Sequence, residues 1–174
     1  MGDNQGVNPS GSSGDVAFDS VAGMLDYPMF VVTASAGGEM AGCLVGFTSQ
    51  VSIDPRRFLV ALSTRNHTFR VAERAEHLAV HLLSGVDPEL ARLFGEHTGD
   101  QTDKFTHCAW HADESGVPIL DAAPAWFIGR ILDRLPFGDH VGFVLQPTAG
   151  QVRTDPPAMI TFADVRDLEA GHDA

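Results

Sequence analysis

Two polar clusters lie within residues 42–75, and they are the best candidates for chemistry in the chain. The first interrupts an apolar run and comprises Gly46, Phe47, Thr48, Ser49, Gln50 and Ser52. A glycine inside a strand often marks a bulge. The backbone donors and acceptors of a bulge suit the polar edge of a planar heterocycle, although a purely structural bulge would carry the same glycine.

The second cluster lies between the end of an apolar strand and the start of a helix-like segment, and comprises Ser63, Arg65, Asn66 and Thr68. Backbone amides at a helix N-terminus carry partial positive charge and suit a phosphate. Hydroxyl groups add hydrogen-bond donors, and a guanidinium adds a charge-assisted bond. In the alternative interpretation, Asn66 or Thr68 only caps the helix. Together the two clusters offer a place for a ring and a place for its phosphate.

Eight histidines raise the question of a metal site. The tightest group is His107, Cys108 and His111, but the first two would point to opposite faces of a strand. No second Cys/His pair lies nearby at the spacing of a structural zinc site, so we expect no metal. His77 and His81 lie on a predicted strand and lack the spacing of a zinc-protease motif. The sequence also has no nucleophile elbow, dinucleotide-binding glycine motif or P-loop.

Composition limits the class of protein. A chain of 174 residues with 44% hydrophobic content predicts one domain with a substantial core. Lys and Arg number 11 against 23 Asp and Glu, which gives a formal charge of −12. Such a surface repels phosphates, so we expect no nucleic-acid partner. The apolar runs are too short to span a bilayer, no secretory signal opens the chain, and two cysteines suit a reduced compartment. These features predict a cytoplasmic protein without membrane association.

The elements that must position the two clusters are mostly strands. Residues 1–17 are rich in Gly, Ser, Asn and Asp and are expected to form a disordered tail, with the domain over 18–165 and a C-terminal tail over 166–174. A short helix is expected over Phe18–Leu25. The strands follow one another at short spacing with few helices between them. This pattern favours a closed antiparallel barrel over a βαβ sheet, in which strands and helices alternate regularly. From apolar periodicity we expect strands at 29–34, 40–47, 58–63, 77–83, 125–135, 140–148 and 158–165, and helices at 68–75 and 88–97.

The order and spacing of several segments resemble the flavin reductase-like, FMN-binding split-barrel family, which includes the small reductase components of two-component flavin monooxygenases. The resemblance runs from about Tyr27 to Pro147. It implies a mainly β fold, a six-stranded Greek-key split β-barrel with peripheral helices, and a homodimer with flavin in a groove near the subunit interface. The segments that carry it are "YPMFVVTA", "GCLVGFTSQVSIDPRRFLVALS", "FRVAERAEHLAVHLL", "LARLFGEHTGDQTDKF", "GVPILDAAPAW" and "GDHVGFVLQP".

The resemblance also implies roles for individual residues. The isoalloxazine ring would meet Gly46, Phe47, Thr48 and Ser49. These contacts would be made largely by the main chain, because this chain has Leu44, Gly46 and Phe47 where family members often carry the polar side chains of Thr, Asn and Ser. Gln50 and Ser52 would lie close to the ribityl chain or ring edge. The phosphate would be held by Ser63, Arg65, Asn66 and Thr68. His140 matches a family position on the nicotinamide side of the flavin, where it would orient the nicotinamide or move a proton. The alternative for His140 is a turn histidine bonded to Asp139.

The function implied is hydride transfer from NADH or NADPH to FMN, or to FAD. The cofactor carries the difficult chemistry, while the protein orients the reactants and excludes water. In this family the reduced flavin commonly leaves for a monooxygenase partner. Two alternatives stand beside this hypothesis: a non-enzymatic flavin or haem carrier or sensor, and a reductase that depends on a deazaflavin.

Overall fold

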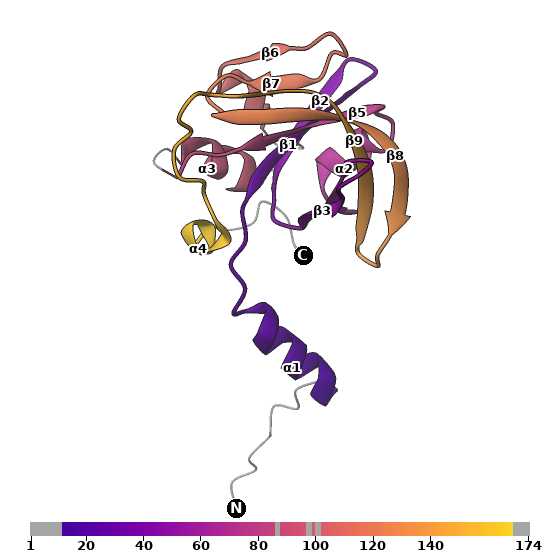
Figure 1. The fold of residues 1–174 in the computed structure, drawn as a ribbon, viewed down its shortest axis with the longest axis vertical. Coiled ribbons are helices and arrows are strands. Elements are labelled where there is room, and N and C mark those ends of the chain that lie inside the picture. Colours follow the sequence, from indigo (N-terminus) through magenta and orange to yellow (C-terminus); the bar gives the residue numbers. More distant parts are fainter. Residues whose placement is uncertain (1–11, 86–87, 97–98, 100–101, 169–174) are drawn as a thin grey trace, which may run out of the picture.

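A seven-stranded antiparallel sheet, curled into a split barrel, forms the centre of the molecule (Figure 1). The computed structural model of the chain describes residues 12–85, 88–96, 99 and 102–168. The strand order is β2-β1-β5-β8-β9-β4-β3, and a separate pair, β6-β7, lies beside the sheet. The strands are β1 Phe30–Ala36, β2 Glu39–Val45, β3 Thr48–Ser52, β4 Arg57–Ser63, β5 His77–Leu82, β6 Trp110–Ala112, β7 Pro118–Leu120, β8 Ala125–Pro136 and β9 His140–Val152. This arrangement confirms the mainly β split barrel, although the sheet has seven strands where six were expected.

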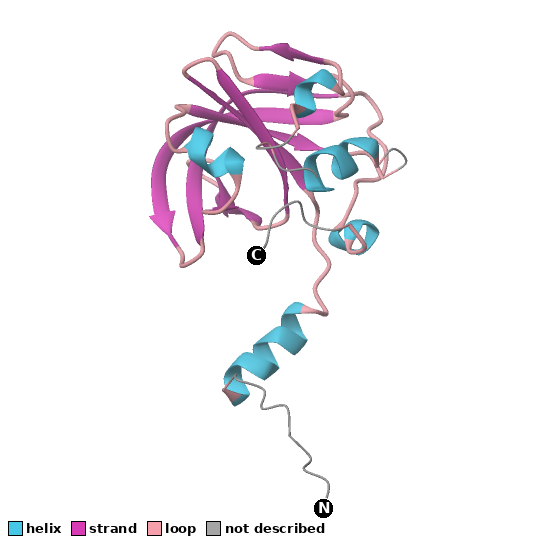
Figure 2. Cartoon of the chain, turned by 180° about the vertical axis from the view of Figure 1, so that it is seen from behind, coloured by secondary structure: helices cyan, strands magenta, loops and turns pink. Residues whose placement is uncertain are grey.

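Short helices surround the sheet, as the view from behind shows (Figure 2). They are α1 Ser13–Ala22, α2 His67–Ala72, α3 Glu89–Glu96, the 3₁₀ helix η1 Lys104–Thr106 and α4 Phe162–Val165. Helices α2 and α3 pack against β1 and β2, whereas α1 extends away from the body in both views. In the part of the chain that the structure describes, no helix is both long enough and apolar enough to cross a membrane.

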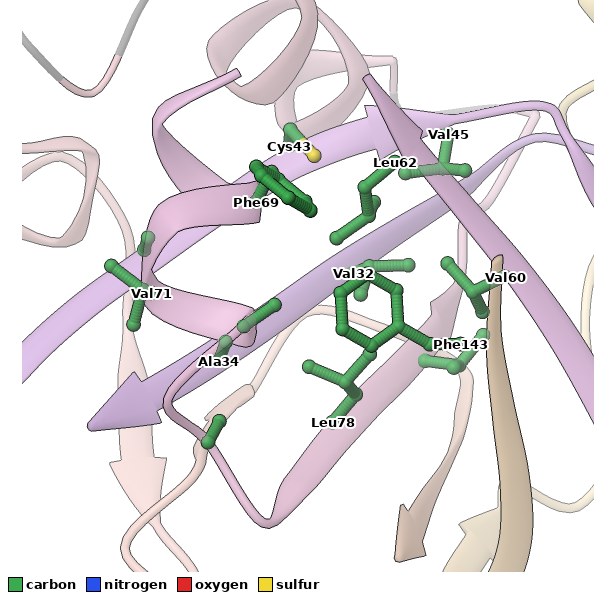
Figure 3. Packing of buried hydrophobic residues seen from close by; sticks show 14 of the residues in the cluster. Val32, Ala34, Cys43, Val45, Val60, Leu62, Phe69, Val71, Leu78 and Phe143 are labelled. Atoms are coloured by element: carbon green, nitrogen blue, oxygen red, sulfur yellow. The ribbon is translucent and has the colours of Figure 1, made fainter. Parts of the chain in front are cut away.

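Strand β1 is buried on both faces, which explains its uninterrupted apolar sequence. Successive side chains of a strand point to opposite faces. Val32 and Ala34 face the barrel interior, where Leu62, Phe69 and other side chains from β4, β9 and α2 pack around them (Figure 3). Val31 lies on the other face, in a second apolar cluster formed with α3, η1, β7 and α4. The sheet is therefore covered on the outside by the segments that connect its strands.

Two expectations about the ends of the domain were wrong. Residues 12–17 are not a disordered tail, because α1 begins at Ser13; Ser12 caps it, and Asp15 completes a capping box. Residues 1–11 lie outside the described part. The expected strand at 158–165 is only two isolated bridges followed by α4. Thr161 and Asp164 form a capping box there. Its hydrogen bonds stabilise a helix in a segment whose apolar pattern is also compatible with a strand.

The remaining elements agree with the sequence more closely. The strands expected at 77–83, 125–135 and 140–148 correspond to β5, β8 and β9. The helix expected at 88–97 corresponds to α3, although its proposed cap, Asp87, lies outside the described residues. The pair β6-β7 was not predicted because its strands have only three residues each.

Candidate functional site

The first cluster begins where the chain leaves one edge strand of the sheet, β2, and enters the other, β3. Gly46 occupies this crossing, and a Cβ atom added there would lie 2.5 Å from Cε2 of Tyr27 and 2.9 Å from Sδ of Met29. The crossing is held by a hydrogen bond from Thr48 N to Gly46 O (2.9 Å) and by another from Ala61 N to Phe47 O (2.8 Å). The glycine therefore serves a tight turn that is packed against Tyr27, rather than the bulge expected at this point.

Strand β3 is an outer strand, and its backbone forms the exposed edge of the sheet. It pairs with β4 only, through Thr48 with Val60 and Ser49 with Leu59. The register shifts between Gln50 and Ser52, so the bulge lies four residues after Gly46. Because an outer strand has a row of backbone N–H and C=O groups without a strand partner, this edge supplies the donors and acceptors that the sequence predicted.

His140 lies beside this edge although it is 93 residues further along the chain than Phe47. It opens β9 and pairs with Ser63, the last residue of β4. The centroid of its ring is 5.1 Å from that of Phe47, with the planes inclined by 57°. Phe47 itself is 58% exposed. The sheet register thus brings both sequence clusters and His140 to one place.

The carboxylate of Asp139 orients the His140 ring. Nδ1 of His140 donates to Oδ1 of Asp139 over 2.8 Å. This hydrogen bond, and then the charge of the imidazole, lower the pKa of Asp139, so the carboxylate is ionised at neutral pH. With Nδ1 engaged, Nε2 is the nitrogen left to meet a ligand. The turn bond considered as the alternative is thus present, and it fixes the ring instead of occupying all of it.

The second cluster divides into two parts. Ser63 and Arg65 lie at the end of β4, where the Ser63 Oγ accepts from the Arg65 amide (3.3 Å). Asn66 caps α2, because its Oδ1 accepts from the Thr68 amide (2.9 Å). Thr68 is only 1% exposed, and its side chain hydrogen-bonds with the thiol of Cys43 in the core. Ser63 and Asn66 are thus half-buried and Arg65 is exposed, whereas Thr68 is buried and its hydroxyl points into the protein.

Sequence reasoning missed Thr64, which joins the two sides of the site. Its amide donates to the Asp139 carbonyl (2.9 Å), and its hydroxyl donates to the same oxygen (3.1 Å). Gly138, at φ +108°, allows the tight turn that brings Asp139 there. The contact spans 75 residues, and the only signal for it was a threonine in a hydroxyl-rich turn.

The group His107, Cys108 and His111 does not converge. His111 pairs with Asp121 over 2.6 Å, the thiol of Cys108 contacts the Lys104 carbonyl over 3.6 Å, and His107 caps the C-terminal end of η1. Among the described residues, no three His, Cys, Asp or Glu side chains are placed to hold a metal ion.

Comparison with known proteins identifies the family to which the chain belongs. The family model "Flavin reductase like domain" matches residues 22–168. The chain is 31% identical over 122 residues to the stachydrine N-demethylase reductase subunit Stc3 of Rhizobium meliloti (strain 1021), a match that covers 68% of this chain and 52% of that protein. It is 28% identical over 137 residues to an NADH:FMN oxidoreductase of Rhodococcus erythropolis, covering 77% and 70%.

Solved structures show the same fold. The NADH:FAD oxidoreductase SgcE6 of Streptomyces globisporus C-1027 superimposes with a TM-score of 0.77 at 23% identity, over 90% of this chain and 95% of that one. The chain thus spans nearly all of this structural neighbour but only about half the length of the demethylase reductase subunit.

Proposed function

This chain belongs to the flavin reductase-like domain family, and we propose that it is an NAD(P)H:flavin oxidoreductase. The observation that carries the proposal is the convergence of three separate segments at one edge of the barrel. The exposed backbone of β3, the end of β4 and the start of β9 meet through the pairing of Ser63 with His140 and the ring contact of His140 with Phe47. One ligand that has both a ring and a phosphate would touch all three.

The residues present fit FMN or the FMN portion of FAD. A flavin ring carries hydrogen-bonding atoms along one edge, and the β3 backbone from Phe47 to Ser49 presents donors and acceptors along a line, with Gln50 and Ser52 following it. The Ser63 hydroxyl and the Arg65 guanidinium lie at the adjacent corner, where a charge-assisted bond to phosphate is favourable. Asn66 completes this corner. In this proposal Thr68 acts indirectly, since its buried hydroxyl holds α2 against the core.

His140 is proposed to position the second substrate. Bound flavin supplies the chemistry, as acceptor of a hydride from NADH or NADPH. Asp139 holds the His140 ring through Nδ1, so Nε2 is turned toward a ligand and can hydrogen-bond the nicotinamide amide. The Phe47 ring lies against one side of the His140 ring. Positioning of this kind contributes strongly to rate because reacting atoms must approach closely and in line.

The proposal extends to the setting in which the protein works. Two names among the relatives, a reductase subunit of an N-demethylase and an NADH:FMN oxidoreductase, support a role in supplying reduced flavin to a monooxygenase partner. We also propose a homodimer and a cytoplasmic location. The exposed side chains of Val51 in β3 and of Phe47 and Ile53 at its two ends support the dimer, because apolar side chains of this size favour a covered surface.

A flavin titration followed by a reduction assay tests the function. We expect saturable quenching of FMN fluorescence at micromolar or tighter affinity, and oxidation of NADH or NADPH that depends on added FMN. His140→Phe separates binding from turnover: it retains a ring beside Phe47 but lacks both nitrogens, so FMN should bind while reduction slows. Titrations with FMN and FAD that show no quenching would overturn the proposal. Flavin binding without reduction by NADH or NADPH would indicate a non-enzymatic flavin carrier instead of a reductase.

A further inference from the structure

Helix α1 is a regular, well-capped helix that extends away from the rest of the described chain (Figure 1). None of its residues is buried. Phe18, Val21 and Leu25 lie at helical spacing on one face and are 70%, 58% and 53% exposed. An isolated helix of ten residues is marginal in water even when it is well capped. Burial of this apolar face against another surface would therefore stabilise α1.

The link between α1 and the body of the same chain is short. Main-chain hydrogen bonds continue the helical path from Gly23 N to Asp19 O (2.9 Å) through Leu25 N to Ala22 O (3.1 Å). The next residue, Asp26, is fixed to α4 by bonds from Ala163 N (2.9 Å) and from Thr161 Oγ1 (3.0 Å). Three residues, Gly23 to Leu25, separate the helix from this anchor, and α1 points away from the body (Figure 1).

An apolar groove of about 560 Å³ lies next to this anchor. One wall is the segment from Pro156 to Met159, which immediately precedes the residues that hold Asp26. The opposite wall comes from the start of β8 and the end of β9, with Trp126, Phe127 and Val152 facing it. Val152 is 69% exposed. In size and composition the groove suits the large side chains of a helix face.

Charge supports this pairing. Asp15 and Asp19 lie four residues apart and border the apolar face of α1. A smaller cavity of about 210 Å³ shares Trp126 with the groove and is lined by Arg153, His111 and Asp121, and the Asp121 carboxylate pairs with His111. Among the described residues no carboxylate forms an ion pair with Arg153, whose guanidinium donates to the backbone oxygen of Asp121 (2.7 Å). In a chain of net charge −12, this cation is an uncommon complement to an acidic helix.

We propose that two copies of this chain exchange their N-terminal helices, so that α1 of each copy lies in the groove beside Trp126 of the other. The groove wall at Pro156–Met159 and the residues that hold Asp26 follow one another in the chain. The same contact between helix and groove can therefore form twice about a twofold axis, as closed dimers require. The inference rests on the proposed homodimer but not on the proposed flavin chemistry.

Trp126 reports the contact in a Trp110→Phe background, where it is the only tryptophan. Val21→Asp places a charge on the apolar face, and Val16→Asp is the matched control because Val16 is similarly exposed (53%) on the opposite side of the helix. We expect Val21→Asp to shift Trp126 emission to longer wavelength and to raise the dimer dissociation constant at least tenfold by light scattering. Val16→Asp should change neither.

Cysteine pairs then distinguish exchange from other contacts. Chains with Leu25→Cys and chains with Val152→Cys, both carrying Cys108→Ser, should form a disulfide-linked pair when mixed and oxidised, and much less when each is oxidised alone. A disulfide within one chain of the double variant, without any between chains, would overturn exchange. A dimer whose Trp126 ignores Val21→Asp would overturn exchange and leave the homodimer standing. A wild-type monomer at all concentrations would overturn both.

Discussion

Acid should destabilise this fold through a single buried histidine, His81. Its side chain is fully buried in β5, where Nδ1 donates to the carbonyl of Val31 in β1 (3.0 Å) and Nε2 accepts from the amide of Leu120 in β7 (3.1 Å). The bond from the Leu120 amide requires the neutral ring, because a protonated imidazole has no acceptor, whereas the bond to Val31 is compatible with either form. Burial is the main reason that the pKa of His81 falls from 6.5 to about 4.

The size of the effect follows from this pKa. A group with a lowered folded-state pKa contributes its stability fully above the unfolded-state value, here 6.5, and loses it as the pH falls toward about 4. The fall in pKa corresponds to about 3 kcal/mol in total. Of this, about 2 kcal/mol should disappear between about pH 7.5 and about pH 5, a range that lies above the titration of ordinary carboxylates.

Urea unfolding of the wild type and of His81→Gln across this range is the appropriate assay. The variant should be less stable at neutral pH by about 1–3 kcal/mol, since one buried partner is left without a hydrogen bond, but it should lose the wild-type decline in acid. His77→Gln is the control, because His77 lies on the same strand and is only half-buried; this variant should keep the wild-type slope. Parallel pH dependences in the wild type and His81→Gln would refute the reasoning.

Three further predictions concern the site. His140→Ala should lower kcat/KM for NADH-dependent flavin reduction roughly ten- to a thousandfold with little change in FMN affinity; unchanged stopped-flow reduction would remove the residue from the mechanism. Arg65→Ala should weaken FMN by about 1–3 kcal/mol but leave riboflavin, which lacks the phosphate, unaffected; calorimetry showing equal losses would contradict the phosphate contact. Gly46→Ala should lower stability by about 1–3 kcal/mol, because its Cβ would meet the Tyr27 ring. Gly14→Ala should not, because its Cβ would lie at an ordinary contact distance of 3.5 Å from Ser12 Oγ; equal melting temperatures for both variants would show that the Tyr27 ring moves aside.

Local signals were sufficient for much of the fold. The long β-branched and aromatic segments specified β5, β8 and β9 because each strand buries a continuous apolar face. The helix expected over Phe18–Leu25 overlaps the second half of α1, but signals failed for its first half and for α4, where a capping box decides the conformation. Ser12 with Asp15 was readable in principle, since the capping pattern is local, but the polar composition around it suggested disorder instead.

The sequence by itself determined which residue types could bind a ring and a phosphate, and that they follow a glycine and the end of a strand. Only the tertiary structure decided which of them meet. The register of β4 against β9 places Ser63 beside His140, and the burial of α2 turns Thr68 into the core while Arg65 stays at the surface. Side-chain direction depends on packing between elements far apart in the chain. Spacing along the sequence therefore identified the cluster but could not assign each member to the ligand or to the core.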